Sequence, residues 1–330
     1  FHKQSTVNKI RIKSVILDQT EENALNARND ALELEIKILE ELHKKVLEIS
    51  KDIVGLSKKV SSLDVYSTLG YIAKVHNWCC PKLDNSKDFI IKDGRHSVVE
   101  KTILQKGLNT FVPNDCSLSA DQNLWLITGP NMAGKSTFIR QNAHMIILAQ
   151  IGSYIPAKQA KIGVANKLFS RIGASDNISK GQSTFMVEML ETSNIIKNAD
   201  SRSFVILDEI GRGTATFDGL AIAWAIIEKI MRSNQSRTLF ATHYHELTDI
   251  ENKNTKVRNV SCEIKEWNNE IIYSYKVING KSRGSLGIKV AELAGFPNDV
   301  IVEANVLLRK LQKGEVIEKN FALSEGDFEK

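Results

Sequence analysis

One stretch of the sequence, LWLITGPNMAGKSTFIRQ at residues 124–141, constrains the fold more than any other. Four apolar residues lead into a Gly-Pro turn, and a second glycine, a lysine and two hydroxyl residues then open a helical pattern. This order fits the phosphate-binding loop G-x-x-x-x-G-K-[ST], in which backbone N–H groups at a helix N-terminus receive a phosphate chain. A chance match is the alternative, but the strand before the loop and the helix after it supply the context that the motif requires.

The residue types of this loop each suit a part of a bound nucleotide. Gly129 and Gly134 let the backbone curl without a clash from a Cβ atom. Lys135 reaches the β and γ phosphates, Ser136 offers its hydroxyl to Mg²⁺, and Thr137 reaches the α-phosphate side. The sequence therefore predicts a site for ATP or ADP with Mg²⁺, formed by Gly129, Pro130, Asn131, Met132, Ala133, Gly134, Lys135, Ser136 and Thr137.

Two further groups follow apolar strands. Asp208 and Glu209 end the run FVILDE, so we expect Asp208 to hold Mg²⁺ and Glu209 to orient or deprotonate an attacking water. His243 follows a third apolar run, and ligands of a parallel sheet bind at the carboxyl ends of its strands. The alternatives are a surface acid pair and a structural histidine. We predict an ATPase whose catalytic residues are Glu209, His243 and Lys135, because an adjacent second carboxylate suits hydrolysis by water.

Strands and helices alternate between residues 121 and 250, which predicts an α/β fold with a mostly parallel sheet. The expected strands are 124–128, 203–208 and 237–242, and the expected helices are 135–150, 184–198 and 217–232. Outside this region we expect strands at 89–91, 97–99 and within 257–277, two short helices within 286–312, and a loose polar tail after Lys313.

Residues 21–64 have the pattern of a long amphipathic helix, and a further helix is expected at 63–75. The apolar residues recur at spacings of three and four, which makes a heptad-like seam. The seam consists of Leu39, Leu42, Val46, Ile49, Ile53, Leu56, Val60 and Leu63. Two interpretations stay open: a helix packed on its own domain, and a long lever or coiled-coil arm.

Composition excludes some classes of protein. The net charge of +5 permits a nucleic-acid partner without requiring one, and the absence of the guanine-reading tetrad N-K-x-D disfavours GTPases. None of the four cysteines has the spacing of a zinc or redox pair, which predicts a reducing compartment such as the cytoplasm, and the bias towards Ile, Lys and Asn suggests an AT-rich, bacterial genome. No run of apolar residues is long enough to cross a membrane. Because the chain begins with Phe1, we expect a piece of a longer protein.

Several motifs resemble, in order, those of the MutS family of DNA mismatch repair proteins. They are RHSVVE at 95–100, GPNMAGKST at 129–137, STFMVEM at 183–189, DEIGRGTATFDG at 208–219 and FATHYHEL at 240–247. The resemblance covers roughly residues 20–312. The departures are Ala133, Ala215, Phe217 and Leu286, and none of them removes a catalytic group.

The resemblance implies a P-loop ATPase of the ABC type that dimerises head to tail. In such a dimer Ser183 reaches the γ-phosphate of the nucleotide on a second copy, although Ser183 and Thr184 alone would be read as a helix cap. Phe111 is implied to stack on adenine, with a core phenylalanine as the alternative. Asn131 is implied to lie near the γ-phosphate, and Gly211–Asp218 along the dimer interface.

The implied organisation has four parts: a helical lever segment at 1–80, the ATPase domain at 81–285, a helix-turn-helix at 286–312 and the tail at 313–330. The helix-turn-helix is expected to mediate dimerisation rather than DNA reading, because it lacks a dense basic face. Implied partners are a second copy, mismatched double-stranded DNA through regions outside this chain, and a MutL-type repair protein, with no membrane. Two alternatives remain: a nucleotide-binding dimerisation module without turnover, and a relative that acts on recombination intermediates.

Overall fold

The structure is a computed structural model that describes residues 2–6, 9–12, 14–107, 110–173, 184–267, 270–282 and 287–312. The chain divides into two units, Phe1–Leu69 and Gly70–Lys330. The predicted residue Ser183 and the predicted tail lie outside the described residues. None of the described helices is both long enough and apolar enough to cross a membrane.

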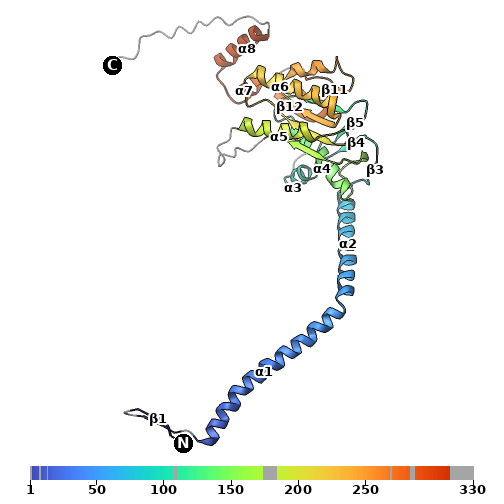
Figure 1. The fold of residues 1–330 in the computed structure, drawn as a ribbon. Coiled ribbons are helices and arrows are strands. Elements are labelled where there is room, and N and C mark those ends of the chain that lie inside the picture. Colours follow the sequence, from blue (N-terminus) through green and yellow to red (C-terminus); the bar gives the residue numbers. More distant parts are fainter. Residues whose placement is uncertain are drawn as a thin grey trace, which may run out of the picture. The chain divides into compact units, whose positions relative to one another are not determined.

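The first unit contains a two-stranded antiparallel hairpin and two long helices (Figure 1). The strands are β1 (His2–Thr6) and β2 (Lys9–Ile12), and the helices are α1 (Val15–Glu48) and α2 (Ser50–Val75), the latter continuing into the second unit. No residue of α1 is buried, and the predicted apolar seam is exposed along its length.

The predicted helix boundary near residue 63 is wrong, because the break lies at Ile49. There the backbone leaves helical geometry (φ −99°, ψ 4°). The hydroxyl of Ser50 donates to the carbonyl of Leu47 over 2.7 Å, which satisfies a carbonyl at the end of α1. The carbonyl of Ile49 then accepts the first bonds of α2, from Asp52 and Ile53.

The second unit is built on a six-stranded sheet with the order β12-β11-β6-β10-β9-β8 (Figure 1). Its strands are β6 (Leu124–Thr128), β8 (Leu168–Arg171), β9 (Phe204–Asp208), β10 (Arg237–Ala241), β11 (Val257–Trp267) and β12 (Glu270–Asn279). All neighbours are parallel except β11 and β12, so the predicted mixed, mostly parallel sheet is confirmed. The central strands β6, β9 and β10 are buried at every residue, as a sheet covered on both faces requires.

Alternate residues of the central strands enter two separate cores, because side chains on a strand point to opposite faces. Trp125 and Ile127 of β6 pack in one core with α4 (Lys135–Gln150), whereas Leu124 and Leu126 pack in the other with α6 (Thr216–Lys229). The short π-helix η2 (Ile230–Asn234) extends α6, and the 3₁₀ helix η3 (His245–Ile250) follows β10. The helix α5 (Thr184–Asn198) lies against β8.

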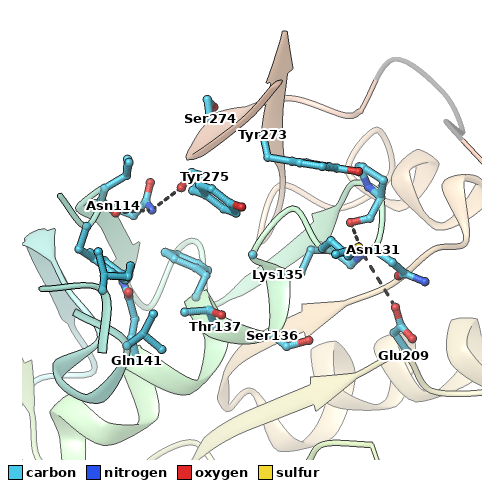
Figure 2. A pocket seen from close by; sticks show the side chains of 18 of the residues that line it. Asn114, Asn131, Lys135, Ser136, Thr137, Gln141, Glu209, Tyr273, Ser274 and Tyr275 are labelled. Atoms are coloured by element: carbon cyan, nitrogen blue, oxygen red, sulfur yellow. Dashed lines mark hydrogen bonds and ion pairs between the residues drawn. The ribbon is translucent and has the colours of Figure 1, made fainter. Parts of the chain in front are cut away.

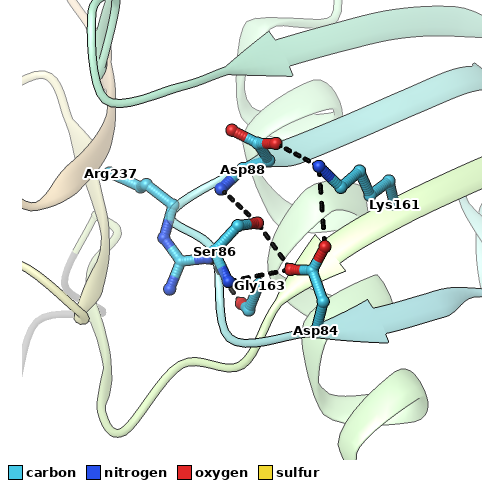
Figure 3. A network of polar contacts seen from close by, with 6 residues as sticks. All are labelled: Asp84, Ser86, Asp88, Lys161, Gly163 and Arg237. Atoms are coloured by element: carbon cyan, nitrogen blue, oxygen red, sulfur yellow. Dashed lines mark hydrogen bonds and ion pairs between the residues drawn. The ribbon is translucent and has the colours of Figure 1, made fainter.

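A second sheet of four strands has the order β3-β7-β4-β5. It contains β3 (Lys82–Asp84), β4 (Phe89–Gly94), β5 (Asn114–Leu118) and β7 (Gln159–Gly163). Figure 3 shows the polar contacts at its end, where Lys161 pairs with Asp84 and Asp88. The buried guanidinium of Arg237, at the start of β10, donates to the carbonyl of Gly163 and so ties this sheet to the larger one.

The predicted strand at 97–99 is wrong, because these residues begin the helix α3 (Ser97–Gln105). The imidazole of His96 accepts a bond from the N–H of Val99 over 3.5 Å and caps this helix. A cap of this kind outweighs the strand preference of two valines. The two helices predicted within 286–312 are confirmed as α7 (Gly287–Leu293) and α8 (Asn298–Gln312).

Candidate functional site

Three loops leave the central sheet at the same edge. In the register of the sheet, Ala241 at the end of β10 lies opposite both Ile127 of β6 and Asp208 of β9. The loops that begin at Gly129, Glu209 and Thr242 therefore meet at the carboxyl ends of three neighbouring strands. That edge is the usual place for a ligand of an open parallel sheet.

The predicted phosphate loop, Gly129–Thr137, curls back at the head of α4. Gly129 (φ 133°) and Gly134 (φ 97°) adopt backbone angles that favour glycine, and Gly134 is the N-cap of the helix. Met132 also has a positive φ of 70°, and its side chain is 79% exposed. Ala133 is buried, so it anchors the loop while Met132 projects into solvent.

The ammonium of Lys135 is buried at the centre of this loop. It donates to the carbonyls of Gly129 over 2.6 Å and Pro130 over 3.1 Å, and it lies 3.9 Å from a carboxylate oxygen of Glu209. Burial lowers the pKa of Lys135, and the nearby charge of Glu209 partly opposes that shift. A buried cation with mostly neutral partners favours the approach of an anion.

Asp208 and Ser136 have the chemistry of a Mg²⁺ site. Burial raises the pKa of Asp208, and a hydrogen bond with the Ser136 hydroxyl partly lowers it. The buried Oδ1 of Asp208 has no hydrogen-bond partner among the described residues. Among the described residues there is no group of three His, Cys, Asp or Glu that could hold a metal by itself. The pair of Asp208 and Ser136 suits Mg²⁺, which takes one or two protein oxygens and keeps waters and phosphates as its other ligands.

Glu209 lies between the lysine and a surface arginine. One carboxylate oxygen faces Lys135 and the other accepts a bond from Arg212 over 2.6 Å. The backbone of Glu209 has a φ of 52°, which is a strained value for a residue other than glycine. His243 lies near enough to sense the charge of Glu209: burial lowers the pKa of His243, and Glu209 opposes the shift.

A hollow of about 840 Å³ opens beside the loop. Nine predicted residues line it: Phe111, Pro130, Asn131, Met132, Gly134, Lys135, Ser136, Thr137 and Glu209. Gly129, Ala133, Asp208 and His243 do not reach its wall, although they belong to the same loops. The structure thus brings Phe111 and the predicted phosphate loop into one cavity, which the sequence spacing alone could not establish.

Several lining residues were not predicted from the sequence, and two of them share a hydrogen bond. Tyr275 lines it from β12, and Asn114 lines it from β5 (Figure 2). The amide of Asn114 donates to the carbonyl of Tyr275 over 2.9 Å and accepts the N–H of Val277 over 2.7 Å. These two bonds hold an irregular segment of β12, where the register with β11 shifts and Tyr275 has a φ of 54°. The only available signal was the aromatic pair Tyr273 and Tyr275 in an edge strand.

The chain matches known proteins over most of its length. Residues 125–312 match the family MutS domain V. A DNA mismatch repair protein MutS from Ruegeria pomeroyi is 48% identical over 317 residues, which are 96% of this chain and 36% of that protein. The proteins of the same name from Roseobacter denitrificans and Paracoccus denitrificans are 47% and 45% identical, with the same coverage. The chain thus spans about a third of the length of these relatives.

Proposed function

The chain belongs to the MutS family of DNA mismatch repair proteins, and on that premise we propose that it binds ATP with Mg²⁺ and hydrolyses it to ADP and phosphate. We further propose that it is the ABC-type ATPase part of a mismatch repair protein. A second copy, mismatched double-stranded DNA and a MutL-type protein would then be its partners. Closure of two nucleotide sites between two copies would drive conformational change on the DNA.

The observation that carries this proposal is the grouping around Lys135. A buried ammonium, a carboxylate 3.9 Å away and a glycine-rich loop at a helix N-terminus share one hollow. The ammonium exchanges the carbonyls of Gly129 and Pro130 for phosphate oxygens, which carry full charge and bind it more strongly. The backbone N–H groups of the loop receive the remaining phosphate oxygens.

The other residues complete the site. Asp208 and Ser136 would hold Mg²⁺, which would neutralise charge on the phosphates. Glu209 orients the attacking water, and His243, whose pKa is lowered by burial, contacts it as a neutral imidazole at pH 7. Phe111 and Tyr275, which both line the hollow, stack on the adenine. Ser183 of a second copy completes the site in trans.

The test is the variant Glu209→Gln, which keeps the shape of the side chain and removes its charge. We expect Glu209→Gln to bind ATP, to lose hydrolysis and to sediment as a dimer in ATP. Lys135→Ala should lose nucleotide binding. Glu228→Gln is the matched control, because among the described residues Glu228 pairs only with Trp224 of α6 and Arg232 of η2.

Activity measured against protein concentration separates the alternatives. Activity per chain should rise with concentration, because each site needs a second copy. If Glu209→Gln hydrolyses ATP at the parent rate, the role given to Glu209 is wrong. If the parent chain binds ATP and shows no turnover at any concentration, the chain is a nucleotide-binding dimerisation module instead.

A further inference from the structure

A buried carboxylate outside the hollow holds the loop that carries Glu209. Glu188, on α5, accepts the N–H of Gly211 over 2.6 Å. Gly211 lies two residues after Glu209 and is itself buried. We propose that Glu188 is a positioning residue for hydrolysis, which sets the place of the Glu209 carboxylate through Gly211. The inference rests on the proposed ATPase function and concerns how that site is kept in order.

Gly211 is held from three directions. Its N–H donates to Glu188, and its carbonyl accepts the hydroxyl of the buried Tyr244 over 2.9 Å. Its backbone lies against Gly219, whose carbonyl oxygen would be only 2.7 Å from a Cβ atom at Gly211. Gly211 also has a φ of 88°, which favours glycine. These contacts fix the position of the Gly211 backbone, and the hydrogen bond to Glu188 is one of them.

The other end of the short segment is held by the sheet. The N–H of Glu209 donates to the carbonyl of Ala241 on β10 over 2.9 Å. Between these two bonds, Glu209 adopts its strained φ of 52°, at a cost of about 1–3 kcal/mol for a residue other than glycine. A strained residue keeps its angle only while its neighbours are fixed. Loss of the bond to Glu188 frees the segment to relax and moves the carboxylate away from Lys135.

Burial of the charged Glu188 carboxylate carries a desolvation cost, so packing alone does not explain a glutamate at this position. Glu188 and its partner Arg171 both have side chains less than a tenth exposed, and their closest atoms are 3.4 Å apart. A buried ion pair of this kind contributes little net stability, and apolar residues of similar volume often serve as well. Arg171 also lies 3.2 Å from Glu191, which is half exposed. The arginine thus neutralises Glu188, whose second oxygen remains directed at Gly211.

The position of Glu188 along α5 connects this tether to the subunit interface of the proposed dimer. The helix begins at Thr184, directly after the predicted trans residue Ser183. A Cβ atom at Gly213 would lie 3.0 Å from the side chain of Phe185, so the first turn of α5 also touches the loop. A displacement of α5 therefore reaches Glu209 of the same chain through Glu188.

The experiment compares Glu188→Leu with Glu191→Leu in the full chain. Both changes remove a carboxylate that faces Arg171, but only Glu188 contacts Gly211, and leucine has no atom that could accept its N–H. We expect Glu188→Leu to lower kcat by about 100-fold, the size of effect produced by a misplacement of about 1 Å. The Kd for ATP should stay within about twofold, because Glu188 does not line the hollow. Glu191→Leu should match the parent in both.

Two further measurements keep the inference testable. Hydrogen exchange of the Gly211 amide, without nucleotide, should become faster in Glu188→Leu and stay unchanged in Glu191→Leu. Tyr244→Phe, which removes the second tether of the same glycine, should lower kcat in the same direction and serves if Glu188→Leu does not fold. Unchanged exchange or unchanged kcat in Glu188→Leu overturns the inference, and so does an equal loss of ATP affinity. A parent chain without turnover is a different result, because it refutes the proposed function and removes this inference with it.

Discussion

Truncation of Tyr275 tests whether β12 supplies half of the adenine site. The variant Tyr275→Ala removes only the ring, since Asn114 bonds the main-chain carbonyl of residue 275 and keeps the bulge in place. Alanine and tyrosine have similar difficulty with the φ of 54° at this position. The change therefore leaves the backbone of β12 in place, and it opens space beside Gly134, where a Cβ atom would lie 3.4 Å from the ring.

The size of the effect follows from how much of the ring is available to a base. Stacking of a base on an aromatic side chain contributes about 1–3 kcal/mol by alanine substitution. Tyr275 is 52% exposed, so only about half of its surface is free to be covered by a base, and the lower part of that range applies. A loss of about 1–1.4 kcal/mol corresponds to a Kd for ATP that is about five- to tenfold weaker.

Calorimetric titration with ATP and with inorganic triphosphate separates the base from the phosphates. Tyr275→Ala should weaken ATP and leave triphosphate unchanged, whereas Tyr275→Phe should bind both like the parent. An ATP affinity within twofold of the parent would refute the stacking role. Equal weakening of ATP and triphosphate would show that the change disturbs the phosphate loop rather than the base.

Three further predictions concern the stability and reactivity of the second unit. Burial lowers the pKa of His96 to about 4, so the folded protein binds this proton less tightly than the unfolded chain. The free energy of unfolding should therefore fall as the pH drops from 6.5 towards 4. The variant His96→Asn keeps a capping group and should reduce that fall, as measured by chemical unfolding curves. Gly163→Ala should destabilise the protein by about 3 kcal/mol or more, because its Cβ atom would overlap the carbonyl oxygen of Ser86. Gly55→Ala, in open space on α2, should stabilise it by about 0.5–1 kcal/mol. An unchanged free energy of unfolding in Gly163→Ala would contradict the close packing at that glycine. Of the four free thiols only Cys80 is exposed, so Ellman's reagent should label one cysteine rapidly in the native protein and four after unfolding; rapid native labelling of the buried thiols would contradict their placement.

The sequence predicted the central sheet well because both of its faces are covered. Residues 204–207, for example, are all apolar, and such runs followed by turn residues are typical of buried parallel strands. Gly129, Glu209 and Thr242 each follow directly after one of the three central strands, so the edge of the sheet at which the site lies was also predictable. These features depend on local pattern and on the strand order that βα units favour.

The failures fall where a single side-chain contact, local or distant, decides the backbone. Val98 and Val99 prefer strands, but the side chain of His96 caps a helix there. The break at Ile49 depends on a serine hydroxyl that competes for a helix carbonyl. Tyr275 faces the hollow only because Asn114, 161 residues away, fixes a bulge in β12. A period-two pattern contains no information about such a bulge.

The geometry of Glu209 shows the same division between what a motif determines and what tertiary contacts determine. The pair Asp208-Glu209 after an apolar strand identifies the residues, yet it does not specify that Glu209 adopts a φ of 52°. That angle needs fixed points on both sides, and the structure supplies them from β10 through Ala241 and from α5 through Glu188. Without both, the backbone would relax by about 1–3 kcal/mol, and the carboxylate would leave the 3.9 Å approach to Lys135. A site of this kind therefore depends both on the motif that supplies the chemical groups and on a separate strand and helix that hold them at a strained angle.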